Sequence, residues 1–145
     1  MLKRIQDDMK QAMKAGDKKR LSTIRMLLAA VKNESIEKRK ELSSEDILGV
    51  IQREIKQRRT AIADFAAGGR KDLVHEYEAE IAILESYLPP QLSDEELEAL
   101  VRQAVAETGA SSLREMGKVM GKIMPQVKGK ADGERVQAIV HKILA

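Results

Sequence analysis

The segment from residue 116 to residue 124 repeats methionine, glycine and lysine every four residues, and these side chains are the ones most able to bind a ligand. Two lysines around a further glycine follow at 128–130. Lysine ammonium groups neutralise phosphate charge, and glycine lets another backbone come close. The pattern is therefore compatible with binding of a phosphate-bearing polymer. The candidate nucleic-acid-binding residues are Gly117, Lys118, Gly121, Lys122, Lys128, Gly129 and Lys130.

Helical geometry sorts this repeat into columns. Each residue of an α-helix turns by ~100°, so a four-residue repeat drifts by only ~40° per step. Val119, Ile123 and the methionines span an arc of roughly 140°, which we expect to be buried. The glycines lie beside that arc, and the lysines come next, towards solvent. Two glycines cost a helix up to ~2 kcal/mol relative to alanine, so we expect something to approach the backbone there.

The residues after this helix extend the basic surface. They lead into Asp132, the predicted cap of the last helix, and free N–H groups at a helix N-terminus favour anions. A structural interpretation stays open, because Gly-x-x-x-Gly also packs helices together and methionines at helical spacing are usually core. No aromatic residue follows Tyr87 to stack a base. Any binding is therefore predicted to use phosphates and backbone shape.

A second charged set, in the first half of the chain, predicts a possible interaction surface for another protein. Its members are Arg25, Asn33, Glu34, Arg58 and Arg59. Asn33 stands in the middle of a predicted helix, where an amide has poor helix propensity. If its side chain turned inward beside Arg25 and Glu34, it would join a polar network between helices. The alternative is a solvated helix face with ion pairs between residues four apart.

The sequence lacks the residues that independent catalysis requires. It has no cysteine and no glycine-rich phosphate loop, and neither His75 nor His141 has a ligand-spaced partner. We therefore predict no catalytic residue, no metal site and no cofactor. No apolar run approaches the ~20 residues that span a bilayer, and charge begins too early for a secretory signal. These features predict a cytoplasmic protein without membrane contact.

Composition favours helices throughout the 145 residues. The chain is 43% hydrophobic but only 2% aromatic, so Leu, Ile, Val, Met and Ala must build its core. Apolar residues recur at helical spacing in seven segments, whose ends are marked by glycine, serine, aspartate and proline. The predicted helices cover about 2–15, 18–41, 44–67, 71–88, 94–108, 112–124 and 133–144, with Pro125 ending the sixth.

A domain boundary is predicted at Pro89-Pro90, because a double proline ends a helix and favours an extended connection. The expected fold is all-α, with a four-helix N-terminal domain at 1–90 and a three-helix domain at 91–145. The net charge is +3, and basic residues concentrate at the end of the chain. Residues 111–145 carry seven Lys or Arg against three Asp or Glu, which favours an anionic partner.

Several short motifs along nearly the whole chain resemble the YqeY family. They are Arg20–Leu27, Lys32–Glu34, Gln57–Arg59, Gly69–Leu73, Leu84–Leu92, Met116–Met120 and Lys128–Asp132. This family is grouped with the tail domain of GatB, the B subunit of the tRNA-dependent Asp/Glu amidotransferase. The resemblance implies an all-α fold with a GatB-like tail at 91–145, and it implies that this tail helps to recognise tRNA without performing chemistry.

The function implied by this resemblance is non-catalytic binding of tRNA or another structured RNA, or an adaptor role beside amidotransferase subunits. A protein-interaction module is the alternative. Family labels also name a carbon–nitrogen ligase with glutamine as amido donor. Amide transfer requires an activated nucleophile to release ammonia and ATP to activate a carboxylate, and the sequence offers neither site.

Overall fold

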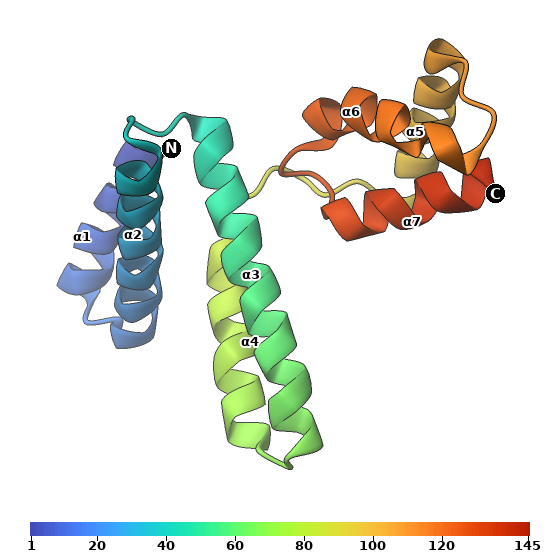
Figure 1. Ribbon diagram of the computed structural model, residues 1–145. Helices are drawn as coiled ribbons and strands as arrows, with labels where there is room; N and C mark the ends of the chain where they lie inside the picture. The colour runs from blue at the N-terminus through green and yellow to red at the C-terminus, as the bar shows by residue number, and fades with distance from the viewer. The chain divides into compact units, whose positions relative to one another are not determined.

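The structure, a computed structural model, describes all 145 residues and consists of helices joined by short connections (Figure 1). Seven α-helices and one 3₁₀ turn follow one another without a strand, which confirms the all-α prediction. The elements are α1 (Leu2–Ala15), α2 (Lys18–Lys38), α3 (Ser44–Ala67), α4 (Lys71–Glu85), α5 (Asp94–Thr108), the 3₁₀ turn η1 (Leu113–Glu115), α6 (Met116–Val127) and α7 (Gly133–Leu144).

The helices gather into two compact units, Met1–Leu88 and Pro89–Ala145. The first contains α1–α4 and the second contains α5–α7. Each unit has its own cluster of buried hydrophobic residues. The predicted domains at 1–90 and 91–145 stay a prediction, because a domain must also fold by itself.

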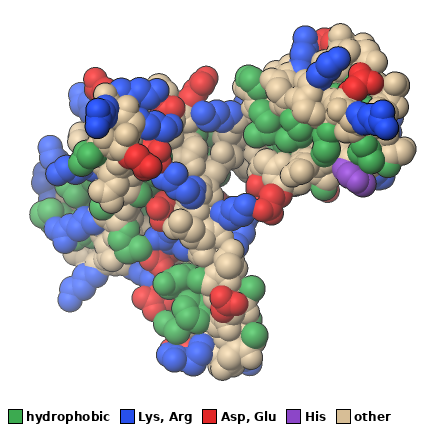
Figure 2. Space-filling model, in the orientation of Figure 1, with side chains coloured by type: hydrophobic (Ala, Val, Ile, Leu, Met, Phe, Trp, Pro, Cys, Tyr) green, Lys and Arg blue, Asp and Glu red, His purple; other side chains and the backbone are tan.

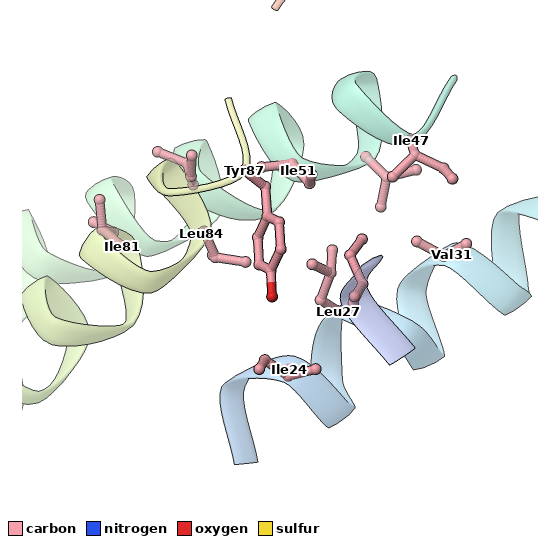
Figure 3. Close-up of a cluster of buried hydrophobic side chains, with 11 residues drawn as sticks. Ile24, Leu27, Val31, Ile47, Ile51, Ile81, Leu84 and Tyr87 are labelled. Carbon is pink, nitrogen blue, oxygen red and sulfur yellow. The ribbon is translucent and has the colours of Figure 1, made fainter. Parts of the chain in front are cut away.

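Two helical hairpins form the first unit around an aliphatic core (Figure 3). α1 packs on α2, α3 packs on α4, and α2 contacts both α3 and α4. The core side chains labelled in Figure 3 are Ile24, Leu27, Val31, Ile47, Ile51, Ile81, Leu84 and Tyr87. The Tyr87 hydroxyl donates to Asp8 Oδ2 at 2.6 Å, and burial raises the pKa of Tyr87. This hydrogen bond ties the segment after α4 to α1.

The α3–α4 hairpin continues past this core. No residue of α3 after Arg58 is buried, and none of α4 before Glu80. Phe65 and Tyr77 pack edge to face in this outer part, with ring centroids 5.2 Å apart. Figure 2 shows apolar side chains at this end of the hairpin. Arg58 and Glu80 therefore lie in the last fully covered layer of the first unit.

The second unit packs its three helices pairwise around a core without aromatic residues. Its fully buried side chains are Leu97, Val101, Val119, Ile123, Val127, Val136 and Val140. Arg135 of α7 holds the segment that leads into α5, because its guanidinium donates to Asp94 Oδ1 at 2.8 Å and to the Leu92 carbonyl. The Leu92 N–H in turn donates to the Lys130 carbonyl at 2.9 Å. These bonds fix the loop that carries the basic residues after α6.

Two helix ends differ from the prediction in the first unit. α2 ends at Lys38, before the predicted Glu41, because Arg39 adopts the left-handed conformation with φ 53°. Its N–H donates to the Ile36 carbonyl, and the Lys40 N–H donates to the Ser35 carbonyl. A left-handed residue other than glycine has no clear sequence signal. α4 likewise ends at Glu85, short of the predicted Leu88.

Pro125 does not end α6, contrary to the prediction, and the helix continues to Val127. Proline lacks an N–H, so the Gly121 carbonyl four residues earlier loses its helical donor. Gly121 is exposed, so water can take the place of that donor. Because Pro125 lies near the end of the helix, few later bonds depend on it. The short turn η1 leads directly into the helix, and no side chain caps the N-terminus of either element.

Candidate nucleic-acid interface

The buried face of α6 is formed by its aliphatic residues. Val119, Ile123 and Val127 are fully buried in the core of the second unit. The methionines at 116, 120 and 124 are only half-buried and lie along the edge of that face. Figure 2 shows an apolar band between α6 and α7 on the visible face of this unit. The methionine column is therefore part core and part surface, and less buried than predicted.

The glycine column of α6 faces solvent. Gly117 and Gly121 are both exposed within a regular helix. A Cβ atom built on either residue meets no neighbouring atom within 4 Å. Close packing between helices of this chain therefore does not explain the Gly-x-x-x-Gly pair. Neither glycine has a positive φ, so backbone conformation does not explain them either.

The lysines beside this column differ in whether they have partners. Lys118, Lys128 and Lys130 are exposed, and their ammonium groups make no ion pair. Lys122 is paired: its Nζ lies 2.9 Å from Glu107 Oε2 of α5. The bond to Lys122 holds the pKa of Glu107 below its usual value. Three of the four candidate lysines are thus free to meet an anion.

Gly129 does not belong to the exposed surface, contrary to the prediction. It is buried, has φ 80°, and its carbonyl accepts a hydrogen bond from Gln91 Nε2 at 2.8 Å. Its role is to turn the chain after α6, where the left-handed conformation favours glycine. A glycine just after a helix is a known stop signal, so the sequence did contain the information to place it.

The N-terminus of α7 offers less to an anion than the sequence predicted. The Asp132 side chain accepts a hydrogen bond from the Glu134 N–H at 3.0 Å. This carboxylate occupies one first-turn donor and adds a negative charge. The anion-binding potential of the second unit therefore rests on the three unpaired lysines.

The predicted interaction surface of the first unit is largely taken up by contacts between its own helices. Glu34 of α2 lies 2.5 Å from Arg53 of α3, and this bond holds the pKa of Glu34 below its usual value. Arg59 of α3 lies 2.9 Å from Glu85 of α4. Arg25 remains exposed and unpaired. Of the predicted set, Arg25 and Asn33 are the residues left to meet a partner.

Arg58 is placed differently from the prediction, whereas Asn33 agrees with the alternative of a solvated helix face. Asn33 is exposed and joins no polar network, because its position on α2 points away from the core helices. Arg58 is only 5% exposed and lies 2.8 Å from Glu54 and 3.9 Å from Glu80. The sequence did signal this burial, since Arg58 falls at helical spacing with the apolar residues of α3. Glu80, buried on α4, was missed altogether.

The acidic and histidine side chains of the chain do not gather into a metal-binding group. No group of three His, Cys, Asp or Glu side chains could hold a metal ion. His75 is exposed beside Glu78, and His141 is exposed on α7. No helix is both long and apolar enough to cross a membrane. What the second unit offers is a bare helix face with cations beside it.

Comparison with known proteins identifies the family. The model of the family described as Yqey-like protein matches residues 2–144. The chain belongs to the YqeY family. A YqeY-like relative, altered inheritance of mitochondria protein 41 of Pyrenophora tritici-repentis, is 31% identical over 99% of this chain and 81% of its own length.

The proteins of the same name in Kluyveromyces lactis and Lachancea thermotolerans are 37% and 35% identical to this YqeY-like chain. The matches cover 82% and 74% of this chain but only 66% and 59% of those relatives. All three names call the relative mitochondrial, which contradicts the predicted cytoplasmic location. That prediction failed because the lack of a secretory signal does not distinguish the cytosol from other compartments.

Proposed function

We propose that the second unit of this YqeY-like protein binds structured RNA, such as tRNA, and that it does so without catalysis. The RNA backbone would approach the exposed face of α6 along Gly117 and Gly121. Lys118 lies beside that face, and Lys128 and Lys130 extend the positive charge. The family resemblance supports this proposal, because it implies a GatB-like tail at 91–145 that helps to recognise tRNA beside amidotransferase subunits.

The single observation that carries this proposal is the glycine pair on α6. Each glycine costs an exposed helix about 1 kcal/mol relative to alanine, yet a Cβ atom would fit at both positions. Nothing inside the chain offsets that cost. A partner that needs the bare helix backbone would offset it, and a side chain at either position would hold that partner away.

The neighbouring charges favour a phosphate-bearing partner. Lys118, Lys128 and Lys130 have no internal ion pair to break before they bind. Neutralising phosphates releases the condensed counterions, so binding of this kind weakens steeply as salt rises. The unit has no aromatic side chain on which a base could stack. Recognition would therefore depend on RNA shape and phosphate positions.

A filter-retention titration of a tRNA transcript across ionic strength tests the proposal. We expect wild-type affinity to fall steeply with salt, and Lys118→Gln/Lys128→Gln to lower the log–log slope by about 0.7–0.9 for each lysine. Arg25→Gln is the matched control, since it removes an exposed unpaired cation from the first unit. Absence of retention at low salt would exclude RNA binding, and an equal loss in Arg25→Gln would place the RNA elsewhere.

A protein helix is a second candidate partner for the same face. The half-buried methionines beside the bare glycines favour it, because methionine adapts to varied apolar surfaces and small residues let helices pack closely. This alternative predicts no tRNA retention together with capture of an amidotransferase subunit by the full chain. Loss of that capture in Gly117→Leu, with no change in Lys10→Gln on the exposed side of α1, would assign the contact to α6.

A further inference from the structure

One of the candidate cations is held by an acidic side chain. Lys122 Nζ lies 2.9 Å from Glu107 Oε2, and Glu107 Oε1 accepts a hydrogen bond from Gln103 Nε2 at 3.1 Å. Both carboxylate oxygens are therefore occupied. Gln103 lies one turn before Glu107 on α5, so it fixes the carboxylate in the position that meets Lys122. The ion pair links α5 to α6 at the edge of the proposed interface.

The position of Glu107 on its helix is unfavourable by itself. It is the penultimate residue of α5, which ends at Thr108. The negative end of the helix dipole disfavours an acidic side chain there, and the last turn of α5 has no basic residue to offset it. The contacts with Gln103 and Lys122 offset this cost, and the one with Lys122 reaches across to α6. This position suggests a role beyond stabilising α5.

The pair is open to displacement. The side chains of Lys122 and Glu107 are 44% and 41% exposed, so solvent and solutes reach both. Exposed ion pairs of this kind are held weakly. A phosphate that approaches the glycine face of α6 would meet Lys118 free and Lys122 occupied. To use Lys122, that phosphate must take the place of the Glu107 carboxylate.

We propose that Glu107 is an autoinhibitory competitor that occupies Lys122 in the free protein and gives it up to an RNA phosphate. This inference rests on the proposed function of α6. The free protein presents three unpaired lysines to a passing anion, and a fourth becomes available only when a phosphate is placed well enough to displace Glu107. Glu107 therefore lowers affinity for weakly or diffusely charged anions more than affinity for a fitted RNA backbone.

Glu107→Gln tests this inference in the full chain, with the same tRNA transcript as probe. Glutamine keeps the size of the side chain and removes its charge, so Lys122 becomes free. Wild type and Glu107→Gln make the same phosphate contacts once the RNA is bound, so the log–log salt slope should not change. The affinity should rise by up to about fivefold at each salt concentration, because no carboxylate has to be displaced from Lys122. Glu107→Ala should raise the affinity to the same extent, because it also removes the carboxylate.

Two further variants separate release of Lys122 from a general change in charge. Glu98→Gln removes the same charge from α5, but the partner of Glu98, at 2.8 Å, is Arg102 on α5 itself. We expect Glu98→Gln to raise the affinity less than Glu107→Gln does. Glu107→Gln/Lys122→Gln should bind no more tightly than Lys122→Gln, because the released cation is then absent.

The outcomes distinguish failure of the proposed RNA binding from failure of the inference about Glu107. If neither wild type nor any variant retains tRNA at low salt, the proposed RNA binding fails. If wild type binds but Glu107→Gln and Glu107→Ala both keep its affinity, Glu107 does not compete and the inference is overturned. An equal gain of affinity in Glu98→Gln also overturns it, since the effect would then come from net charge. Far-UV circular dichroism checks that each variant keeps its helices.

Discussion

The two candidate surfaces differ in what their charged side chains do. In the first unit, Glu34, Arg58 and Arg59 are each paired with an oppositely charged residue of a neighbouring helix. In the second unit, the lysines at 118, 128 and 130 are paired with nothing. A run of charge on a predicted helix is thus compatible with either use. In the first unit the charged side chains hold helices together, whereas in the second unit the lysines stay available to a partner.

The most buried charges of the first unit form a single cluster across three helices. Arg58 of α3 lies between Glu54 and Glu80, and Lys19 of α2 lies 3.2 Å from Glu76 and 3.8 Å from Glu80. Arg58 Nε and Glu80 Oε2 have no hydrogen-bond partner. Charges in such a place are stable only while they are paired. Loss of one member should therefore disturb the whole cluster.

The largest effect that tests this comparison is expected from Arg58→Ala. Glu54 and Glu80 would lose the cation between them, so the free energy of unfolding should fall by about 3 kcal/mol. Urea unfolding followed by tyrosine fluorescence measures this change in the first unit, because Tyr77 and Tyr87 both lie there. Binding of tRNA in the absence of urea should not change.

Arg59→Ala is the matched control for that variant. Its pair with Glu85 is exposed on both sides, so its loss should change the free energy of unfolding by less than about 1 kcal/mol. Replacing both buried charges in Arg58→Met/Glu80→Leu should recover most of the stability lost in Arg58→Ala. If Arg58→Ala and Arg59→Ala lower the free energy of unfolding equally, burial does not distinguish the two ion pairs. The cluster around Arg58 then contributes no more to stability than an exposed ion pair.

Much of the fold could be predicted because the residues that begin and end its helices act on the adjacent backbone. The bounds of α1 match the prediction, and Asp132 caps α7 as predicted. Ser43 and Ser93 cap α3 and α5 through their side chains. The wrongly predicted helix ends depend on contacts that the sequence alone does not reveal. Arg39 ends α2 without a glycine, in a conformation that glycine adopts far more readily. Residue type therefore predicts where a helix ends, except where hydrogen bonds with neighbouring residues favour a different end.

The candidate site was harder to predict than the fold. Its column geometry follows from the four-residue repeat, and the exposure of Gly117 and Gly121 agrees with it. The repeat does not predict which charged residues pair between helices, because Glu107 and Lys122 belong to segments whose packing the sequence leaves open. Gly129 was grouped with the lysines beside it, although its place after a helix marks a turn. Contacts made across helices decided which predicted residues are free.

The second prediction concerns the glycines that set the two surfaces apart. Gly117→Ala/Gly121→Ala should stabilise α6 by about 1 kcal/mol per residue, because both are helical, exposed and free of neighbours. Affinity for tRNA should fall at the same time, although no charge has changed. Hydrogen exchange of the α6 amides measures the first effect, and filter retention measures the second.

Gly109→Ala is the control for that pair. It also lies in the second unit with no atom near its Cβ position, but its φ is 69°. Alanine is strained in that conformation, so the variant should be destabilised where the α6 variants are stabilised. If Gly117→Ala/Gly121→Ala gains stability and keeps full affinity, the bare backbone is not a contact. The proposal would then rest on the lysines alone.

The smallest effect is expected from the capping charge of the first unit. Hydrogen bonds from Ser43 lower the pKa of Asp46 from 3.8 to about 2, and Lys40 lies 3.5 Å away. Since the folded pKa is depressed, this stabilisation is present above pH 4 and is lost as pH falls towards 2. Asp46→Asn should therefore be less stable than wild type at pH 7, and the difference should shrink between pH 4 and pH 2.

Gln57→Ala on the same helix separates this effect from a general response to acid. Gln57 is exposed and carries no charge, so the gap between that variant and wild type should stay nearly constant with pH. The measurement is the urea midpoint by tyrosine fluorescence at each pH. If the Asp46→Asn gap does not close towards pH 2, the Asp46 charge does not stabilise α3. The use of charge to hold the first unit together would then reduce to the buried Arg58 cluster and the pairs between α2 and α3.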